Sequence, residues 1–336
     1  MADFHIQGLV VKPGGQGRLD MPISLLSNQI PLHLSLHVLH GRRPGPVLFL
    51  SAAVHGDEII GVEIIQRLRR LQILRHLRGT LLCIPIVNVH GFIAHTRYLP
   101  DRRDLNRSFP GSATGSLAAQ LAHLFVQEVV SRSHYGIDIH SATMHRRNLP
   151  QIRIAPDNAT LRQMAIAFQA PIIIEAPLRP GSMREAAQAR GVEVLLFEAG
   201  EGLRLDEGSI RIGVRGIVGV MRSLGMLPPA KEKSGGLPRS DPIFSQKSQW
   251  IRAPMSGLLK SGSSIGDVVS GQDLLGVVAD PIGDTCWEVR ANQSGLIIGR
   301  TELPVVNQGD ALFHIALAPR AEPLSSDPLL DEDEIV

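Results

Sequence analysis

Stretches with the pattern of buried strands alternate with amphipathic helix patterns through the first two thirds of the chain. The run 47–53 is apolar, uncharged and of strand length. Residues 58–77 then place apolar side chains at helical spacing, with arginines mostly opposite, up to the glycine at position 79. Similar units follow, with expected strands at 80–87, 136–139, 152–155, 171–174 and 192–197 and expected helices at 117–130, 160–168, from 182 and at 210–224. This alternation predicts an α/β fold with helices on both faces of the sheet.

The composition and the hydrophobic pattern of the sequence change near residue 227. A segment rich in proline and glycine is typical of a linker, and short apolar stretches broken by glycine then predict an all-β region. Within that region 252–258 matches 290–296, and 268–275 matches 305–312. Two copies this short should interlock into one small β-barrel. The expected organisation is a catalytic domain at 1–226 with an N-terminal β segment at 1–44, a linker at 227–248, a β-barrel at 249–318 and an acidic tail at 319–336.

The duplicated region resembles the biotinyl/lipoyl carrier domain, which attaches its cofactor to a lysine in the hairpin between the two copies. The corresponding connection here, 280–284, contains no lysine. We therefore expect a carrier-like barrel that carries nothing. A biotin or lipoyl adduct in an intact-mass measurement would revive a carrier function.

Composition and cysteine spacing argue against nucleic acid and membranes as partners and indicate the cellular compartment. The 34 Lys and Arg nearly balance the 32 Asp and Glu, giving a net charge of +2, and no basic block is interleaved with aromatics, which disfavours nucleic acid. Cys83 and Cys286 lie too far apart for a disulfide framework or a metal knuckle and fit a reducing cytoplasm. With neither a signal-peptide pattern nor a bilayer-spanning apolar run, we expect a cytoplasmic protein that does not bind membranes.

A candidate metal site is the most informative chemistry in the chain. His55 and Glu58 follow the buried strand 47–53, and His140 ends another strand, so all three should emerge at the same sheet edge. Two histidines and a glutamate with an open position form the ligand set of a catalytic zinc. Asp138 shares a strand face with His140 and is one possible acceptor for its second ring nitrogen.

A zinc hydrolase also needs a group that moves a proton from water to the leaving amine. Glu198 closes a buried strand and precedes a glycine-rich loop, which makes it the leading candidate. Glu201, in that loop, is a serious rival, and Glu193, at the other end of the strand, is a weaker one. A structural capping role is the alternative for Glu198.

The arginine-rich segment 96–111 suggests carboxylate recognition. An arginine fork binds a carboxylate through two hydrogen bonds, and Asn106 beside Arg107 could hold one from a substrate. A second arginine near the metal could polarise the scissile carbonyl. For Arg102 and Arg103 a solvated surface role is an equally good interpretation.

Four motifs resemble those of the succinylglutamate desuccinylase/aspartoacylase family, a branch of the zinc carboxypeptidase fold. In chain order they are His55-Gly-Asp-Glu58, Asp104-Leu-Asn-Arg-Ser-Phe-Pro-Gly111, Asp138-Ile-His140 and Phe197-Glu198-Ala-Gly200. They span roughly residues 45–225, and their combination is specific although each is weak alone. The resemblance implies a zinc-carboxypeptidase-like mixed sheet, followed by the β domain of this family.

By position, the resemblance implies that His55, Glu58 and His140 bind one zinc ion per chain and that Glu198 is the general base. These assignments coincide with the residues chosen above on chemical grounds.

The resemblance also implies roles for the arginines. It makes Asn106 and Arg107 the binders of the substrate carboxylate. The family's carbonyl-polarising arginine precedes a tyrosine shortly before the Asp-Leu-Asn-Arg run, which points to Arg97. The spacing here is two residues longer than in the best-known members, so Arg102 stays open. Arg184 is a further candidate for substrate contact.

We therefore expect a zinc-dependent amide hydrolase that removes an acyl group from small-molecule N-acyl amino acids or related carboxylate-bearing amides. The alternative is a metallocarboxypeptidase acting on short peptides, because the same carboxylate clamp serves both reactions. A catalytically inactive scaffold is disfavoured by the full set of ligands and base. The acyl group, the amine and the oligomeric state, including a homo-oligomer, stay open.

Overall fold

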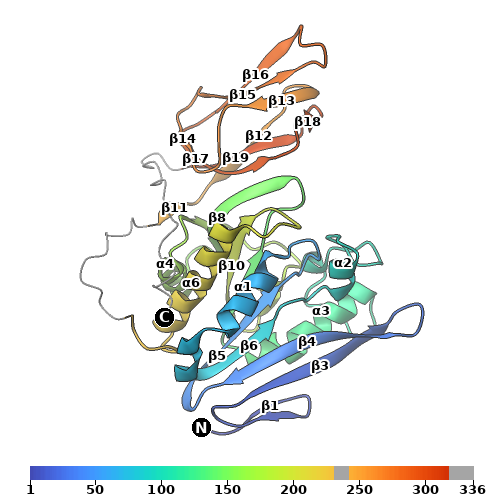
Figure 1. Cartoon of the computed structure of the whole chain (residues 1–336), viewed down its shortest axis with the longest axis vertical. Helices are drawn as coiled ribbons and strands as arrows, with labels where there is room; N and C mark the ends of the chain where they lie inside the picture. Colours follow the sequence, from blue (N-terminus) through green and yellow to red (C-terminus); the bar gives the residue numbers. More distant parts are fainter. Residues whose placement is uncertain (231–241, 318–336) are drawn as a thin grey trace.

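The computed structural model describes residues 1–230 and 242–317, which form a layered α/β body with a smaller β unit at one end (Figure 1). The strands of the body are β1 (Phe4–Ile6), β2 (Leu9–Val11), β3 (Gln16–Leu25), β4 (Pro31–His40), β5 (Arg43–Ala52), β6 (Arg78–Ile84), β7 (Tyr135–His140), β8 (Arg146–Ile154), β9 (Ile172–Glu175) and β10 (Glu193–Gly200). Its helices are α1 (Ile60–Arg69), η1 (Gln72–His76), α2 (Val89–Ile93), η2 (Leu105–Arg107), α3 (Leu117–Glu128), η3 (Val130–Arg132), α4 (Ala159–Phe168), α5 (Met183–Gln188) and α6 (Glu207–Ser223).

Strands β1 and β2 form a small antiparallel sheet of their own, and the other strands of the body form one mixed sheet in the order β9-β8-β10-β7-β5-β6-β4-β3. Neighbouring strands from β10 to β6 are parallel, whereas β8 with β10, β4 with β6 and β3 with β4 pair antiparallel. The carboxyl ends of β5, β7 and β10 therefore meet at one edge, where open α/β sheets place their ligands.

Both faces of this sheet are covered. Phe49 and Leu50 are neighbours in β5, yet they belong to separate buried cores because successive strand residues point to opposite faces. Helices α1, α4 and α6 contribute to the core around Leu50, while α3 and α5 contribute to the core around Phe49. The predicted α/β sheet with helices on both faces is confirmed.

The helix expected at 58–77 is divided in two. The α-helix α1 ends at Arg69, Leu71 takes an extended conformation with φ −68° and ψ 129°, and η1 follows. This break lets Leu74 and Leu77 pack into the same core as α1. Burial of these leucines explains why their helical spacing does not require one continuous helix.

The region after the body begins with β11 (Ile243–Ser245), which lies inside the expected linker 227–248 and pairs in parallel with β9. Residues 231–241 of that expected linker, and the expected acidic tail at 319–336, lie outside the described residues.

The C-terminal unit is built from two four-stranded sheets that share one buried core. Its strands are β12 (Ser248–Arg252), β13 (Gly257–Ser261), β14 (Val268–Val269), β15 (Leu274–Ala279), β16 (Cys286–Arg290), β17 (Gly295–Thr301), β18 (Val305–Val306) and β19 (Ala311–Leu317). The orders are β12-β19-β17-β14 and β16-β15-β13-β18, so each sheet combines strands from both sequence copies. The copies interlock, but the expected closed barrel is not confirmed, because the second sheet is open at β16 and β18.

The two parts are joined by strand pairing. Residues of β17 pair antiparallel with β8, which makes the first sheet of the C-terminal unit continuous with the central sheet. One row of paired residues crosses the junction in the order Gly200, Asn148, Gly299, His314 and Trp250. This row brings C-terminal strands beside the sheet edge that carries the candidate site.

Candidate metal centre and active site

The loop after β5 positions two of the candidate ligands. His55 and Glu58 lie within the tight turn that leads from β5 to α1, and both are buried. Gly56 is required between them, because a Cβ there would lie 1.9 Å from the backbone carbon of Gly91. The turn is thus fixed by its packing against α2.

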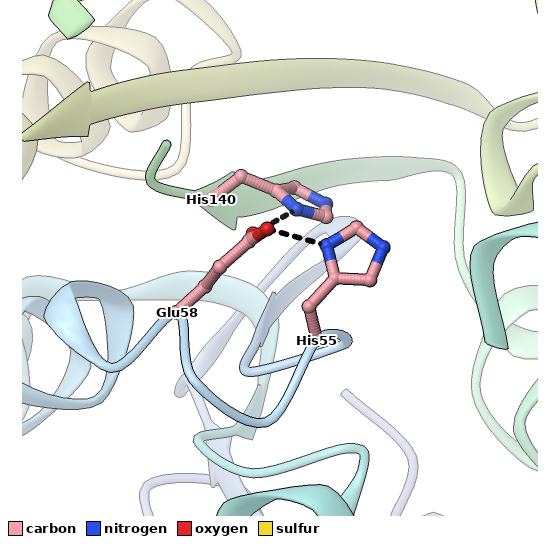
Figure 2. A group of neighbouring side chains, drawn as sticks. All are labelled: His55, Glu58 and His140. Atoms are coloured by element: carbon pink, nitrogen blue, oxygen red, sulfur yellow. Dashed lines mark hydrogen bonds and ion pairs between the residues drawn. The ribbon is translucent and has the colours of Figure 1, made fainter. Parts of the chain in front are cut away.

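His140 completes the cluster from the end of β7. One nitrogen from each histidine and a carboxylate oxygen of Glu58 all lie within 4.8 Å of one another (Figure 2). Glu58 Oε1 is 2.6 Å from His55 Nδ1, and Glu58 Oε2 is 2.6 Å from His140 Nδ1. Two imidazole nitrogens and a carboxylate suit a divalent metal ion such as zinc, so these residues fit a metal site.

Carboxylates hold the far side of each imidazole. Asp138 Oδ2 is 2.7 Å from His140 Nε2, and Ser51 Oγ donates to the other oxygen of Asp138 at 2.7 Å. Asp104 Oδ1 lies 3.2 Å from His55 Nε2. Such partners fix the orientation of a ligand histidine and leave Nδ1 facing the metal position.

The histidines and carboxylates of the cluster stabilise one another's charged forms, which burial alone would disfavour. Burial would lower the pKa of His55, but Glu58 and Asp104 outweigh it and raise that pKa. The same balance, with Asp138 and Glu58 opposing burial, raises the pKa of His140 well above its ordinary value. Burial would raise the pKa of Glu58, but the two histidines hold it far below its usual range. A metal ion bound to these imidazoles would compete with their protons.

Arg97 reaches the cluster, and Arg102 does not. Arg97 Nη1 lies 3.2 Å from Glu58 Oε1, and Arg97 Nη2 donates to Asp104 Oδ2 at 2.8 Å. Burial would lower the pKa of Arg97, but these two carboxylates outweigh it and raise the pKa. The side chain of Arg102 is exposed and makes no ion pair or hydrogen bond with any residue in the described ranges. Of these two arginines, Arg97 is the one close enough to act on a carbonyl at the metal position.

The next motif residues lie in and beside η2. Asn106 is buried and accepts a hydrogen bond from the backbone N–H of Met183 at 2.9 Å through Oδ1, which leaves its Nδ2 for a ligand. Arg107 Nη1 donates to the carbonyl oxygen of Asn106 at 2.5 Å. Desolvation lowers the pKa of Arg107, and the positive charges of Arg179 and Arg97 act in the same direction. Arginines this close to one another favour an anionic ligand.

Glu198 stands beside His140 on the neighbouring strand. The two residues are directly paired between β10 and β7, and the next partner across the sheet is Gln151 of β8. Glu198 Oε2 lies 2.8 Å from Arg153 Nε, although the N–H is not aligned on it as a hydrogen bond. The carboxylate of Glu198 is thus next to a candidate ligand but paired with an arginine.

The two rival glutamates have structural partners. Glu201 Oε1 accepts the backbone N–H of His145 at 3.0 Å, and Glu193 Oε2 accepts from Asn158 Nδ2 at 2.8 Å. Neither contact involves the histidine cluster.

Arg184, at the start of α5, borders the same region. Its Nη1 donates to the carbonyl oxygen of Arg153 at 3.3 Å. Burial and the nearby Arg153 lower the pKa of Arg184 to about 10, although Asp138 and Glu198 oppose the shift. A half-buried guanidinium with one long backbone hydrogen bond keeps donors free for a ligand.

Comparison with known proteins now decides the family. A family model described as the succinylglutamate desuccinylase/aspartoacylase catalytic domain matches residues 44–224, more than half of the 336-residue chain. The chain belongs to the succinylglutamate desuccinylase/aspartoacylase family. Membership makes it a hydrolase that acts on carbon–nitrogen (amide) bonds.

Several relatives in this family match most of the chain. The N-alpha-acetyl-L-2,4-diaminobutyric acid deacetylase of Halomonas elongata is 28% identical over 291 residues, which is 82% of this chain and 83% of the relative. The crystal structure of a succinylglutamate desuccinylase/aspartoacylase from Rhodobacter sphaeroides has a TM-score of 0.78 at 25% identity and covers 90% of this chain and 96% of its own. The product-bound structure of the ectoine utilization protein EutE (DoeB) from Ruegeria pomeroyi gives 0.78 at 25% identity, covering 90% and 94%.

The desuccinylase/aspartoacylase site also contains two residues that sequence reasoning gave no role. Asp104 contacts both His55 and Arg97, and Arg153 contacts Glu198. Asp104 opens the Asp-Leu-Asn-Arg motif, and Arg153 is the one charge in the otherwise apolar expected strand 152–155, so each carried a visible signal. Among the described residues, no helix has the length and apolar composition that a membrane crossing requires.

Proposed function

We propose that this family member is a zinc-dependent deacylase that hydrolyses small N-acyl amino acids or related amides with a free carboxylate. The observation that carries the proposal is the juxtaposition of the buried His55–Glu58–His140 cluster with Glu198 and an arginine-rich rim. A second support is the deacetylase from Halomonas elongata, whose name specifies an N-acetylated amino acid as substrate.

In this proposal His55, Glu58 and His140 hold one zinc ion per chain. When bound, zinc polarises a carbonyl oxygen and lowers the pKa of water toward about 7. Asp138 and Asp104 keep the imidazoles turned toward the ion through contacts of 2.7 and 3.2 Å.

Glu198 moves the proton. It accepts a proton from the attacking water as the new C–O bond forms, and it returns that proton to the nitrogen as the C–N bond breaks. The products are a carboxylate and a free amine. Its pairing with His140 across β7 and β10 supports this role, because it sets the carboxylate beside the reacting centre.

Arginines select and activate the substrate. Asn106 and Arg107 bind the substrate carboxylate, and Arg184 is a further substrate contact. Arg97, the arginine nearest Glu58, stabilises the negative charge that develops on the carbonyl oxygen. Arg153 holds Glu198 by an ion pair at 2.8 Å.

The proposal is tested by a hydrolysis screen of N-acetyl and N-succinyl amino acids that includes Nα-acetyl-L-2,4-diaminobutyrate. We expect release of free amine from at least one amide that carries a carboxylate, and none from its carboxyl ester. A chelator should abolish turnover, and zinc should restore it with one equivalent per chain. Full activity in protein that holds no stoichiometric metal would contradict the proposal.

A further inference from the structure

A second site is indicated by a cavity far from the metal cluster. It has a volume of about 570 Å³ and lies where β5 and β6 begin, against η1 and the end of α6. The loop carrying His55 follows the other end of β5, ten residues along the strand (Figure 1). A ligand in this cavity would therefore not compete with a substrate at the metal.

The wall of this cavity is unusually basic. Its basic lining residues are Arg42, Arg43, Arg75, Arg78, Arg222 and His76, whose Nε2 accepts a hydrogen bond from Arg75 Nε, and no carboxylate of the described residues lines it. None of the five arginines forms an ion pair with a residue in the described ranges, 1–230 and 242–317. By contrast, surface arginines such as Arg67 and Arg147 bind carboxylates at 2.7 and 2.8 Å.

Two of these arginines are strand neighbours. Arg43 and Arg78 are partners in register between the parallel strands β5 and β6, so two positive charges lie side by side at exposed positions. Arg222 Nε is buried and has no hydrogen-bond partner among the residues that the structure describes. An unsatisfied buried donor is costly, and an anion in the cavity would satisfy it while neutralising the pair.

A purely structural role accounts for only part of this cluster. Arg222 lies in the last turn of α6 and Arg75 in the last turn of η1, where a cation interacts favourably with the helix dipole. Arg42 precedes β5, and Arg43 and Arg78 begin β5 and β6, so no such dipole explains their convergence on the cavity.

We propose that this cavity binds a small phosphate anion with two or more negative charges. Guanidinium forks match phosphate oxygens geometrically, and the volume falls within the range of about 300–1,000 Å³ that is typical of small-molecule sites. Leu77 and Leu227 provide an apolar wall. The shape and charge fit an anion that also carries an apolar group, as a nucleoside diphosphate does.

Calorimetric titration of the metal-loaded protein with ADP tests this inference, with AMP and adenosine as probes of lower charge. We expect one saturable site, affinity in the order ADP, AMP, adenosine, and a melting temperature that rises with ADP concentration. The variant Arg75→Ala/Arg78→Ala should lose at least about tenfold in affinity, because each charge-assisted hydrogen bond is worth roughly 1.5–3 kcal/mol. Arg252→Ala/Arg290→Ala removes the same charge from the C-terminal unit and should bind normally.

Two further variants make the outcome decisive. Arg97→Ala/Arg107→Ala should leave ADP binding unchanged, and Arg43→Gln should weaken it while the unliganded protein stays folded with an equal or higher melting temperature. Absence of a saturable site, equal affinity for adenosine, or loss of binding only in the Arg97→Ala/Arg107→Ala variant would each overturn the proposal.

Discussion

The two ring nitrogens of each candidate ligand histidine have different neighbours, and this asymmetry bears on what the site can hold. In His140, Nδ1 faces Glu58 at 2.6 Å and Nε2 faces Asp138 at 2.7 Å. Asp138 is itself bound by the hydroxyl of Ser51. A buried chain of this kind orients the imidazole before any metal arrives, so its removal should weaken metal binding rather than folding alone.

Replacing Asp138 with asparagine tests that chain. The amide keeps the size of the side chain but loses the charge that orients and polarises His140. We expect metal affinity to fall about 10–100-fold, measured by competition with a chromophoric chelator. Ser51→Ala removes only the hydroxyl behind Asp138 and should have a smaller effect. Unchanged affinity in the Asp138→Asn variant would show that the contact is not used to hold metal.

Replacing Glu198 with glutamine tests the proton-transfer role. The amide cannot accept the proton, so kcat/KM should fall about 10²–10⁴-fold while metal content stays at the wild-type level. Glu201→Gln is the matched control, because Glu201 bonds the backbone of His145 instead. A larger loss in the control than in Glu198→Gln would transfer the role to Glu201.

At the scale of elements, the site depends on strand register. Glu198 meets His140 because β10 and β7 pair in parallel at these positions, and it meets Gln151 because β8 runs antiparallel on the other side. The sequence predicts where each strand ends and hence which residues reach the edge. It does not predict which strands are neighbours, so the contact between Arg153 and Glu198 could not be derived from the pattern alone.

The paired strands also bury a histidine of the C-terminal unit. His314 stacks on Trp250 with ring centroids 4.5 Å apart. Burial, reinforced by the positive charge of Arg153, lowers the pKa of His314 from 6.5 to about 3. The folded protein therefore binds fewer protons here than the unfolded chain between these pH values, so stability falls as pH drops through this window.

Replacing His314 with phenylalanine should remove that dependence. The ring still stacks on Trp250, but it cannot take up a proton when the chain unfolds. We expect a shallower loss of unfolding free energy between pH 6.5 and pH 3 than in the wild type, measured by urea unfolding at a series of pH values. His5→Phe makes the same change at an exposed position. An identical pH slope in wild type and His314→Phe would contradict the assignment.

For the whole molecule, the sequence predicts the individual strands and helices better than the long-range pairing between strands. The alternation of strand and helix patterns predicts the body, because buried strands such as 47–53 and amphipathic helices such as 210–224 are local signals. The internal repeat predicts that the copies interlock. The open second sheet and the pairing of Gly299 with Asn148 were not predictable, because edge pairing depends on how separate units dock.

That docking bears on which amides the enzyme accepts. The strands β17 and β19 continue the sheet beyond β8, so the site is flanked by the C-terminal unit instead of opening freely to solvent on that side. A deacylase and a carboxypeptidase both need the carboxylate next to the scissile bond. They differ in the acyl side, which is a small group for one and a peptide for the other.

Two substrate series separate these activities. In the first series the amino acid is extended by one glycine at its carboxyl end, which moves the carboxylate by about 3.5 Å, beyond the reach of Asn106 and Arg107. We expect kcat/KM to fall at least about tenfold, because charge-assisted hydrogen bonds worth roughly 1.5–3 kcal/mol are lost. Arg107→Ala should reduce this difference in kcat/KM, because it lowers the value for the unextended amide most.

In the second series the amino acid is kept and the acyl side grows from acetyl to acetylglycyl and acetylglycylglycyl. A steady fall in kcat/KM with acyl length is the result expected of a deacylase, and a constant or rising value would identify a carboxypeptidase.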